Sequence, residues 1–277
     1  MKLGTLSFVR GSLAAVQALR HPPPVPPGHF YSPSTSREDV ERARRNRRAP
    51  AAVELRAEEQ VALFRALQLV APPLGRWRPG NEWFETADAA VLRGLLLHLK
   101  PGRAIEIGSG YSTALMLDLE DAAPEITCVE PNPERLLSRL LPGDEERLTL
   151  IRSPVQALAP DELAAMIGPG DFLLIDSTHV AKAGSDVCWL ILHTLPLLQP
   201  GVLVHVHDIF WPFEYPDLWL EQRRDWNEAY LLQAFLIDNA AWEITLFNSY
   251  LWSERPEVIP AELRDDDPGS IWLTKRT

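Results

Sequence analysis

From Arg103 to Arg276, short apolar runs alternate with helical stretches, and this alternation limits the available folds more than any other feature of the chain. The runs read RAIEIG, EITCVE, LTLIRS, DFLLID and GVLVHVHD, followed by WEITLFNSYL (242–251) and SIWLTKR (270–276). Strands alternating with helices predict a parallel sheet covered on both faces. Their Val, Ile and Leu content is typical of central strands that are buried on both sides.

The intervening helices are expected at STALMLDLED, PERLLSRLL, DELAAMI and SDVCWLILHTLPLL, and a long helix at PDLWLEQRRDWNEAYLLQAFLIDN follows the fifth strand. Upstream, helical spacing predicts a helix within 53–70, and another from Thr86 to Leu99 has Asp88 in its first turn, where its charge suits the helix dipole. We expect an N-terminal helical and proline-rich cap over 1–85 and an α/β domain over 86–277.

The N-terminal segment contains three further features. Its first residues suit a short amphipathic helix better than a removed signal peptide, because Arg10 interrupts the apolar core. Prolines in 21–36 favour an extended linker or wrap. Five arginines then lie between Arg42 and Arg48. We interpret them as a solvated helix end, with a site for an anionic substrate or partner as the alternative.

Composition argues against several partners. The formal net charge is −11 and the pI is near 5.1, so an acidic surface repels phosphate backbones and no nucleic-acid partner is expected. No apolar stretch is long enough to span a bilayer, so no membrane association is expected. The two cysteines, Cys128 and Cys188, lie in apolar runs without a disulfide framework, which favours the cytoplasm.

The first strand ends in a glycine turn, RAIEIGSGYS, that opens a helix. Gly108 and Gly110 let the backbone approach a ligand closely and leave helix N-terminal amides free to bind it. Glu130 ends the second strand 22 residues after Gly108, where a carboxylate suits a bidentate hydrogen bond to a ribose diol. The alternative is that the glycines serve a tight turn alone. A dinucleotide site would have G-x-G-x-x-G, but Thr113 stands at the sixth position.

Glu106, two residues before the first glycine, makes this turn similar to motif I of class I S-adenosylmethionine (SAM)-dependent methyltransferases, written (D/E)xGxGx, with Ser112 at the third small position. The order of elements from Arg103 to Arg276 also resembles their seven-stranded sheet, whose last strand is antiparallel. Residues 29–34, 174–187 and 205–236, which include HDIFWPFEYP, resemble a bacterial subfamily of mostly unassigned substrate. The resemblance implies a Rossmann-like α/β fold with strand order 3-2-1-4-5-7-6, and SAM as cofactor.

The resemblance also implies a cofactor site. Glu106 and the two glycines would border the methionine part of SAM, Glu130 would hold the ribose hydroxyls, and residues 153–156 would lie near the adenine. The full expected set is Glu106, Gly108, Ser109, Gly110, Tyr111, Ser112, Glu130, Pro131, Asp176 and Ser177.

Ligands of open α/β sheets bind beyond the carboxyl ends of the strands, so the fourth and fifth strands should end facing the transferred methyl group. The fourth ends in Asp176-Ser177-Thr178-His179 and the fifth in His205-Val206-His207-Asp208; we call these two segments the rim. Catalytic roles are expected for Asp176, His179, His207 and Asp208. Either a histidine acts as base, or a divalent metal lowers the acceptor's pKa.

Catechol O-methyltransferase-like enzymes take metal ligands from the ends of these two strands, and Asp176 and Asp208 are similar in placement. The candidate metal set is Asp176, His207 and Asp208; a nitrogen ligand from His207 or His179 would shift preference from Mg²⁺ toward Mn, Fe or Zn. Alternation places His207 and Asp208 on opposite faces, so they converge only if the strand ends between them. His205 is expected to be a core residue.

An acceptor pocket is expected beyond the fifth strand. Spacings of three, four and seven place Arg223, Trp226, Asn227 and Tyr230 on one helix face. Trp211 and Tyr215 would add to the pocket, and Tyr215 and residues 29–34 are also candidates for a lid. The alternative is that Trp226 and Tyr230 are core residues.

Together these features predict a SAM-dependent methyltransferase that acts on an oxygen or nitrogen of a small-molecule acceptor in the cytoplasm, with a homodimer as one option for its assembly. A metal-dependent oxygenase or hydrolase using the His/Asp cluster stays open as an alternative, as does a SAM-binding module without turnover. Thr113 disfavours an NAD oxidoreductase.

Overall fold

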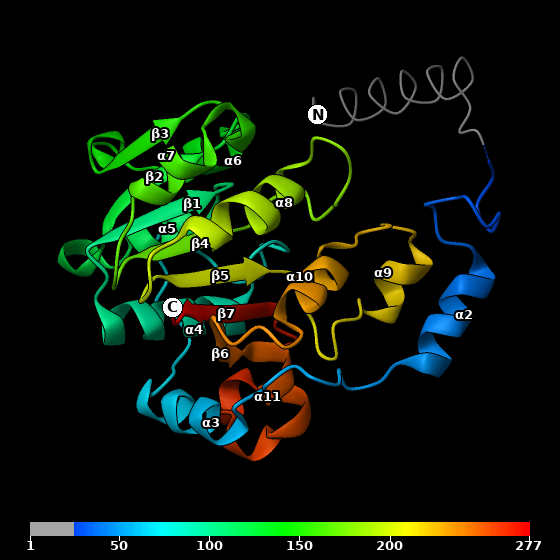
Figure 1. Ribbon diagram of the computed structural model, residues 1–277. Helices are drawn as coiled ribbons and strands as arrows, with labels where there is room; N and C mark the ends of the chain where they lie inside the picture. The colour runs from blue at the N-terminus through cyan, green and yellow to red at the C-terminus, as the bar shows by residue number, and fades with distance from the viewer. Residues whose placement is uncertain (1–24) are drawn as a thin grey trace, which may run out of the picture. The chain divides into compact units, whose positions relative to one another are not determined.

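The computed structural model describes residues 25–277, and the predicted N-terminal amphipathic helix and the start of the proline-rich segment lie outside the described residues. Seven strands form one sheet in the order β3-β2-β1-β4-β5-β7-β6 (Figure 1). This order confirms the predicted fold. The strands are β1 (Arg103–Ile107), β2 (Glu125–Val129), β3 (Leu148–Ile151), β4 (Phe172–Ile175), β5 (Leu203–His207), β6 (Trp242–Phe247) and β7 (Ser270–Lys275).

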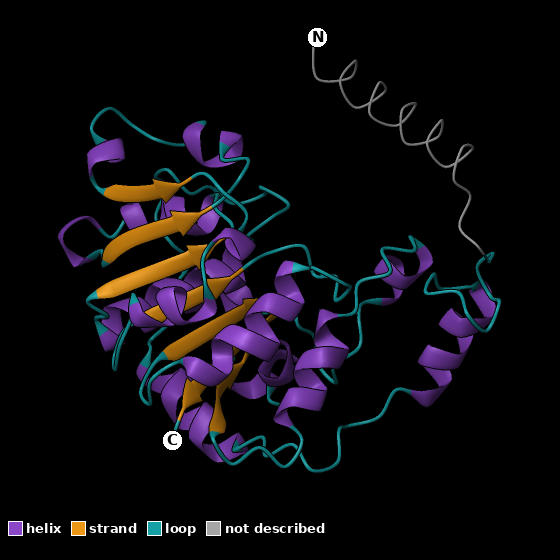
Figure 2. Ribbon diagram, turned by 45° about the horizontal axis from the view of Figure 1, so that its top comes forward, coloured by secondary structure: helices purple, strands orange, loops and turns teal. Residues whose placement is uncertain are grey.

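The strand pairing follows the apolar runs of the sequence. Strands β1 to β5 pair in parallel, and β7 lies antiparallel between β5 and β6. Every residue of β4 and β5 is buried, as expected for central strands with helices on both sides of the sheet (Figure 2). The rings of Phe172 in β4 and Trp272 in β7 stack with their centroids 5.5 Å apart, so aromatic packing extends the core across this edge of the parallel region.

The helices are mostly shorter than the sequence patterns predict, although α4 (Thr86–Leu99) has the predicted bounds. The other helices are α2 (Arg37–Asn46), α3 (Ala57–Ala66), α5 (Tyr111–Leu117), α6 (Glu134–Leu137), α7 (Pro160–Ala165), α8 (Asp186–Cys188), α9 (Asp217–Glu221), α10 (Glu228–Leu236) and α11 (Asn248–Glu254). Short 3₁₀ turns occupy Glu120–Ala122, Asp144–Glu146, Val155–Ala157, Leu195–Leu197, Pro256–Val258 and Ala261–Leu263.

The long helix predicted after β5 is interrupted. Helix α9 ends at Glu221 and α10 begins at Glu228, and in between Arg223 and Asp225 have positive φ angles of 54° and 52°. A right-handed helix cannot include residues in this left-handed region. The prediction that Arg223 continues the helix face of Trp226 is therefore wrong.

Two other predicted elements change character along their length. The predicted strand 242–251 ends at Phe247, where the chain turns into α11. The predicted helix 185–198 is divided into α8, a π-helical stretch (Trp189–Thr194) and the 3₁₀ turn that contains Pro196. Proline lacks a backbone donor and clashes with the preceding turn, so a regular α-helix does not continue through it.

Asp88 does more than complement the dipole of α4. Its side chain is buried and accepts hydrogen bonds from Asn248 Nδ2 (2.8 Å), Ser270 Oγ (2.6 Å) and the Gly269 amide (3.0 Å). A buried carboxylate is tolerated when donors satisfy its oxygens. Asp88 thereby ties the start of α4 to β7 and to the point where β6 turns into α11.

Backbone contacts divide the chain into two units: residues up to Asn46 with Asp217–Asp225, and Arg47–Pro216 with Trp226–Thr277. These positions differ from the predicted boundary between 85 and 86, because α3 packs on β6 in the sheet-containing unit. None of the described helices is long and apolar enough to cross a membrane.

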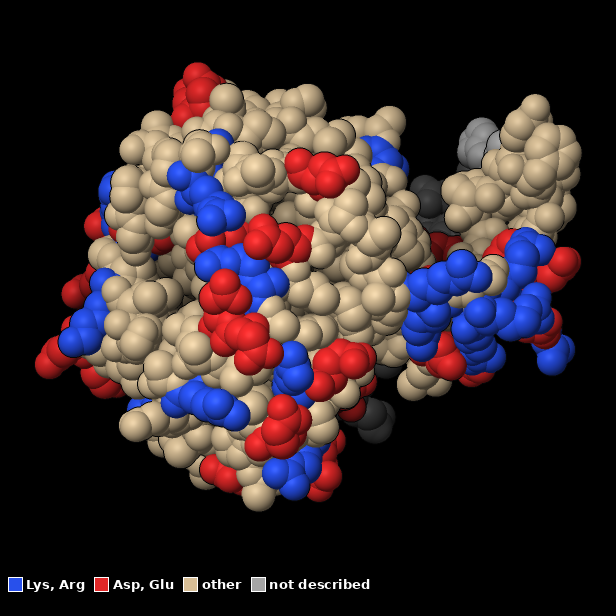
Figure 3. Space-filling model, turned by 60° about the horizontal axis from the view of Figure 1, so that its bottom comes forward, with Lys and Arg blue, Asp and Glu red and all other residues tan. Residues whose placement is uncertain are grey.

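The smaller unit pairs α2 with α9. Arg44 forms ion pairs with Asp217 (3.1 Å) and Glu221, and Arg42 pairs with Glu38 (2.8 Å) and Asp39. Figure 3 shows acidic and basic side chains intermingled on this unit. These pairs account for Arg42 and Arg44 as parts of a solvated helix surface, and they favour that interpretation of the arginine cluster over an anion site.

Candidate active site

The glycine turn between β1 and α5 is forced by a close approach of β4. Gly108 has φ +102°, and a Cβ at this position would lie 2.2 Å from the carbonyl oxygen of Asp176. The Gly108 amide donates to Val129 O (3.1 Å) and the Asp176 amide donates to Ile107 O (2.9 Å). The ends of β1, β2 and β4 therefore meet at this turn, and only glycine fits at Gly108.

Glu106 is fully buried beneath the turn rather than open to a ligand. Its two carboxylate oxygens accept hydrogen bonds from the hydroxyls of Ser112 and Thr113, and Thr113 Oγ1 accepts from the Gly110 amide (3.1 Å). Burial raises the pKa of Glu106 to about 7, against the opposing effect of the two hydroxyls. In this arrangement, Glu106 and Ser112 hold the shape of the turn, and a direct contact of either with the cofactor stays a prediction.

The raised pKa of Glu106 makes stability depend on pH. Between its usual pKa of 4.5 and about 7, the folded state binds more protons than the unfolded state, so this contribution to stability falls as pH rises. Between about pH 6 and about pH 8.5, we expect the wild-type protein to lose roughly 1.4 kcal/mol of unfolding free energy relative to Glu106→Gln, whose side chain does not titrate. Urea denaturation of both proteins at the two pH values measures this, and an unchanged difference would contradict it.

The other predicted cofactor residues lie at the ends of β1, β2 and β4. Glu130 is partly exposed and accepts a hydrogen bond from the Asn132 amide (2.6 Å), while Pro131 is exposed and Tyr111 half-buried. The hydroxyl oxygens of Ser109 and Ser177 are buried without a hydrogen-bond partner among the described residues. Unsatisfied buried hydroxyls are uncommon in native structures, and these two follow neighbouring strands.

Two residues near the turn were not predicted from the sequence. The Arg135 guanidinium lies 3.6 Å from the centre of the Trp83 ring, and a Cβ on Gly110 would lie 3.0 Å from Arg135 Cδ. The Trp83 carbonyl oxygen lies 3.3 Å from His207 Nε2. Trp83 precedes α4 and is far from both neighbours in sequence, so only tertiary packing reveals these contacts.

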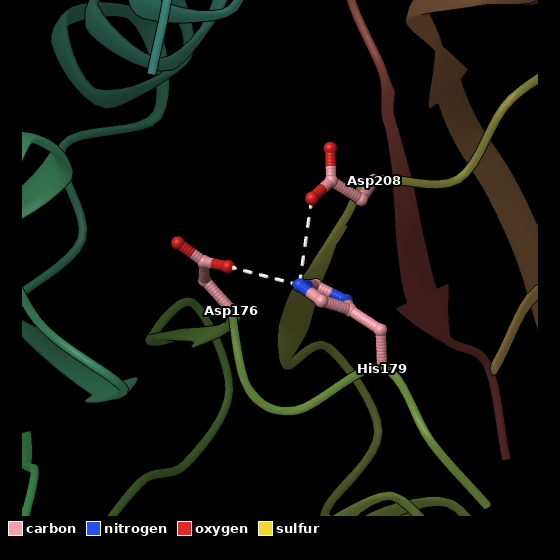
Figure 4. Close-up of side chains that lie close together, drawn as sticks. All are labelled: Asp176, His179 and Asp208. Atoms are coloured by element: carbon pink, nitrogen blue, oxygen red, sulfur yellow. Dashed lines mark ion pairs between the residues drawn. The ribbon is translucent and has the colours of Figure 1, made fainter. Parts of the chain in front are cut away.

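At the rim, β5 ends at His207 as convergence with Asp208 requires. Asp208 takes a left-handed conformation (φ 57°), and its Oδ1 lies 3.8 Å from His207 Nε2. His179 Nε2 lies between two carboxylates, 3.5 Å from Asp176 Oδ1 and 3.4 Å from Asp208 Oδ2 (Figure 4). The two segments of the rim are therefore brought together around the His179 ring.

The group that could hold a metal differs from the predicted one. Ligand atoms of Asp176, His179 and Asp208 all lie within 4.8 Å of one another, so His179 takes the place predicted for His207. His207 Nε2 faces the Trp83 carbonyl, and its Nδ1 has no hydrogen-bond partner among the described residues. Sequence alternation could not show this, because His179 reaches the group from a loop and not from a strand.

His205 is a core residue, as predicted. It is fully buried, its ring contacts Trp272 with centroids 4.4 Å apart, and burial lowers its pKa well below the usual value. Neither ring nitrogen has a hydrogen-bond partner among the described residues. A neutral imidazole in this position contributes packing and no rim chemistry.

The ionisable side chains of the rim shift one another's pKa values. Burial opposes the charge on His179, but its contacts with Asp176 and Glu228 raise its pKa well above the usual value. Burial also opposes ionisation of Asp176, but His179 and the charge of His207 lower its pKa to about 2. For Asp208, burial prevails and raises the pKa. His179 therefore holds a proton between carboxylates near neutral pH, in the position that a bound cation would occupy.

The predicted acceptor residues are separated by the structure. The Trp226 ring lies against His179 in a tilted arrangement with centroids 4.4 Å apart, and Asn227 forms hydrogen bonds with the loop that carries His179. Tyr215 is buried and its hydroxyl accepts from the Ala229 amide (3.1 Å), so it supports α10 rather than forming a lid. Trp211 packs against Phe247 and Tyr250 and donates to Glu254 (3.0 Å).

The remaining two acceptor candidates are Tyr230 and Arg223. Tyr230 is 42% exposed and bonds to Glu214 through its hydroxyl (2.5 Å). Arg223 belongs to the smaller unit. Within the larger unit, Trp226 contacts the His179 ring and Asn227 contacts its loop, and Tyr230 bonds to Glu214.

Comparison with known proteins supports the prediction of a methyltransferase. Residues 105–209 match the model of a family described as a methyltransferase domain, and the match runs from β1 past the end of β5. It therefore includes the glycine turn, Glu130 and both segments of the rim. This match confirms the methyltransferase resemblance for the part of the chain that carries the candidate site.

Individual relatives are distant. An uncharacterized protein of Archaeoglobus fulgidus is 28% identical over 138 residues, which cover 41% of this chain and 61% of that protein. This chain thus spans about three fifths of the length of the curated relative it matches.

Similar solved structures include two O-methyltransferases. TomG from Streptomyces achromogenes, involved in tomaymycin synthesis and in complex with SAM, is 15% identical, with 87% of this chain and 96% of that chain covered and a TM-score of 0.44. An O-methyltransferase from Bacillus cereus in complex with S-adenosylhomocysteine (SAH) is 14% identical, with 79% and 90% covered and a TM-score of 0.44. The fold assignment rests on this chain's own strand order rather than on these likenesses.

Proposed function

We propose that this protein is a SAM-dependent methyltransferase that acts on an oxygen or nitrogen of a small-molecule acceptor. The observation that carries the proposal is the meeting of the glycine turn and the rim at one point of the sheet. Strand order reverses between β1 and β4, and there Gly108 lies against Asp176. Ligands of doubly wound sheets bind at this switch point, beyond the carboxyl ends of the strands.

The residues at the switch point suit the parts of SAM. The partly exposed Glu130 carboxylate would accept hydrogen bonds from the ribose hydroxyls, and backbone amides of the turn would face the methionine part. The buried hydroxyls of Ser109 and Ser177 would gain the partners that the described residues do not supply. SAM supplies an activated methyl group, so the chain itself needs only to orient the reactants, exclude water and move a proton.

In the transfer, a lone pair of the acceptor attacks the methyl carbon, the bond from this carbon to sulfur breaks, and SAH leaves. A hydroxyl or protonated amine acceptor must also lose a proton, for which the Asp208 carboxylate, whose pKa burial raises, is the acceptor at the rim. Trp226 lies against His179 and would form an apolar wall for the acceptor. Alignment and exclusion of water by such a wall favour in-line attack.

A divalent metal is the second candidate for assistance at the rim. Two carboxylates and one imidazole nitrogen within 4.8 Å are a donor set that suits Mn, Fe or Zn better than Mg. Asp176, His179 and Asp208 would hold the ion, and the ion would lower the pKa of an acceptor hydroxyl. The same donor set would serve a metal-dependent oxygenase or hydrolase, but the match to a methyltransferase domain favours methyl transfer.

Calorimetric titration with SAH tests the proposal. We expect saturable binding of SAH and none of NAD⁺, with Glu130→Ala weakening SAH binding by about 10- to 100-fold through loss of a charged hydrogen bond. Glu134→Ala is the matched control, because Glu134 is an exposed glutamate close by in α6. Wild-type protein that binds no SAH would overturn the proposal. A cytoplasmic location, a homodimer and the absence of nucleic-acid and membrane partners stay predictions.

A further inference from the structure

Glu228 is a buried carboxylate that the sequence patterns did not single out. It is the first residue of α10, its exposed fraction is 0%, and its Oε2 lies 2.9 Å from His179 Nδ1. Its Oε1 has no hydrogen-bond partner among the described residues. Burying a carboxylate costs free energy unless a partner compensates it, and His179 is the partner that the structure provides.

The loop that carries His179 is held from the same side. His179 has a left-handed backbone (φ 59°), and its carbonyl oxygen accepts from the amides of Asn227 (3.1 Å) and Glu228 (3.2 Å). The Asn227 side chain also accepts from the Ala181 amide (2.5 Å) and donates to the Ala181 carbonyl (3.3 Å). Residues at the start of α10 thus hold both the backbone and the side chain of His179.

The two nitrogens of the His179 ring face different carboxylates, Nδ1 the Glu228 side chain and Nε2 the rim. A carboxylate only accepts hydrogen bonds, so it selects the form of His179 that carries a proton on Nδ1. Nε2 is then the atom presented to Asp176 and Asp208, at 3.5 and 3.4 Å. Histidines that bind a metal or a proton are oriented in this way by a carboxylate on their other nitrogen.

We propose that Glu228 is a positioning residue, which holds the proton on His179 Nδ1 and so commits Nε2 to the rim. This deepens the proposed function, because it names the support that keeps Nε2 available whether the rim holds a proton or a cation. Without Glu228, a neutral His179 ring would place its single proton on Nε2, where the two rim carboxylates accept it. Nε2 would then offer no lone pair to a cation.

The location of the proton can be measured by long-range ¹H–¹⁵N correlation spectra of protein labelled on histidine, with His179→Gln to assign the signals. In wild type, we expect Nδ1 of His179 to carry a proton both where the ring is charged and, at higher pH, where the ring is neutral. In Glu228→Leu, which keeps apolar bulk but no acceptor, the neutral ring should carry its proton on Nε2. Glu228→Gln keeps an acceptor oxygen and should restore the proton to Nδ1.

A purely packing role for Glu228 would give a different pattern. The neutral ring of Glu228→Leu would then keep its proton on Nδ1, as in wild type, and that result would overturn the proposal. Glu146→Gln removes an exposed charge in the turn Asp144–Glu146 and should give the wild-type spectrum. If Glu228→Leu does not fold, the wild-type spectrum decides alone, since a neutral ring without a proton on Nδ1 contradicts the proposal. The spectra need no SAM, so a failure of SAH binding is distinguishable from a failure of this inference.

Discussion

Gly108→Ala is expected to abolish SAH binding and to destabilise the protein. The new Cβ would lie 2.2 Å from the Asp176 carbonyl oxygen, so β1 and β4 would have to separate at the point where the cofactor is proposed to bind. The positive φ adds roughly 1–2 kcal/mol of backbone strain for a residue with a Cβ. SAH titration should show a loss of more than about 100-fold in affinity, equivalent to about 2.7 kcal/mol.

Gly143→Ala separates steric overlap from backbone strain as the cause of the expected loss. Gly143 has a similar φ of +92°, but a Cβ there would meet nothing within 4 Å. We expect this control to lose stability through strain alone and to bind SAH like wild type. Equal effects of the two substitutions on SAH binding would contradict the steric account of the turn.

His179→Ala is expected to cost about 3–5 kcal/mol of unfolding free energy near pH 7.5, because it leaves carboxylates buried without their cation. Asp176, Asp208 and Glu228 all contact or face the His179 ring, and Glu228 is fully buried. The His179 pKa is raised in the folded state, so its contribution is fully present below its unfolded pKa of about 6.5 and is lost only as pH rises through the higher folded value.

The pH dependence of stability reports the same contact. Because the folded pKa of His179 lies above its unfolded value, the wild-type protein loses unfolding free energy through this ring between about pH 5.5 and about pH 7.5, and His179→Ala lacks this contribution. Urea denaturation at about pH 5.5 and about pH 7.5 measures this difference. His193→Ala, at an exposed histidine, is the control. A loss for His179→Ala no larger than that of the control would mean that the cluster is not held together by this ring.

The strands were predictable because each is a short apolar run, and the order of β-strands and helices then constrains the sheet. The break between α9 and α10 was not predictable, since Arg223 and Asp225 take left-handed conformations without a glycine to indicate them. The residues that follow β4 and β5 were predictable as a rim from strand ends alone.

The support of the rim could not be found from the sequence. His179 and Glu228 are 49 positions apart, and Trp83 reaches His207 from 124 positions away. Only tertiary packing brings such pairs together. Tertiary packing also explains why the candidate metal group contains His179 and not the predicted His207. The position of His179 depends on hydrogen bonds from the Asn227 and Glu228 amides to its carbonyl oxygen.

A crystal structure of the protein with SAH is the most direct test of the central claim. We expect the SAH ribose hydroxyls to bond to Glu130, its methionine part to lie along the turn at Gly108, and its sulfur to face Asp176, His179 and Asp208. SAH bound elsewhere on the chain, or crystals grown with saturating SAH that contain none at the end of β1, would contradict the assignment.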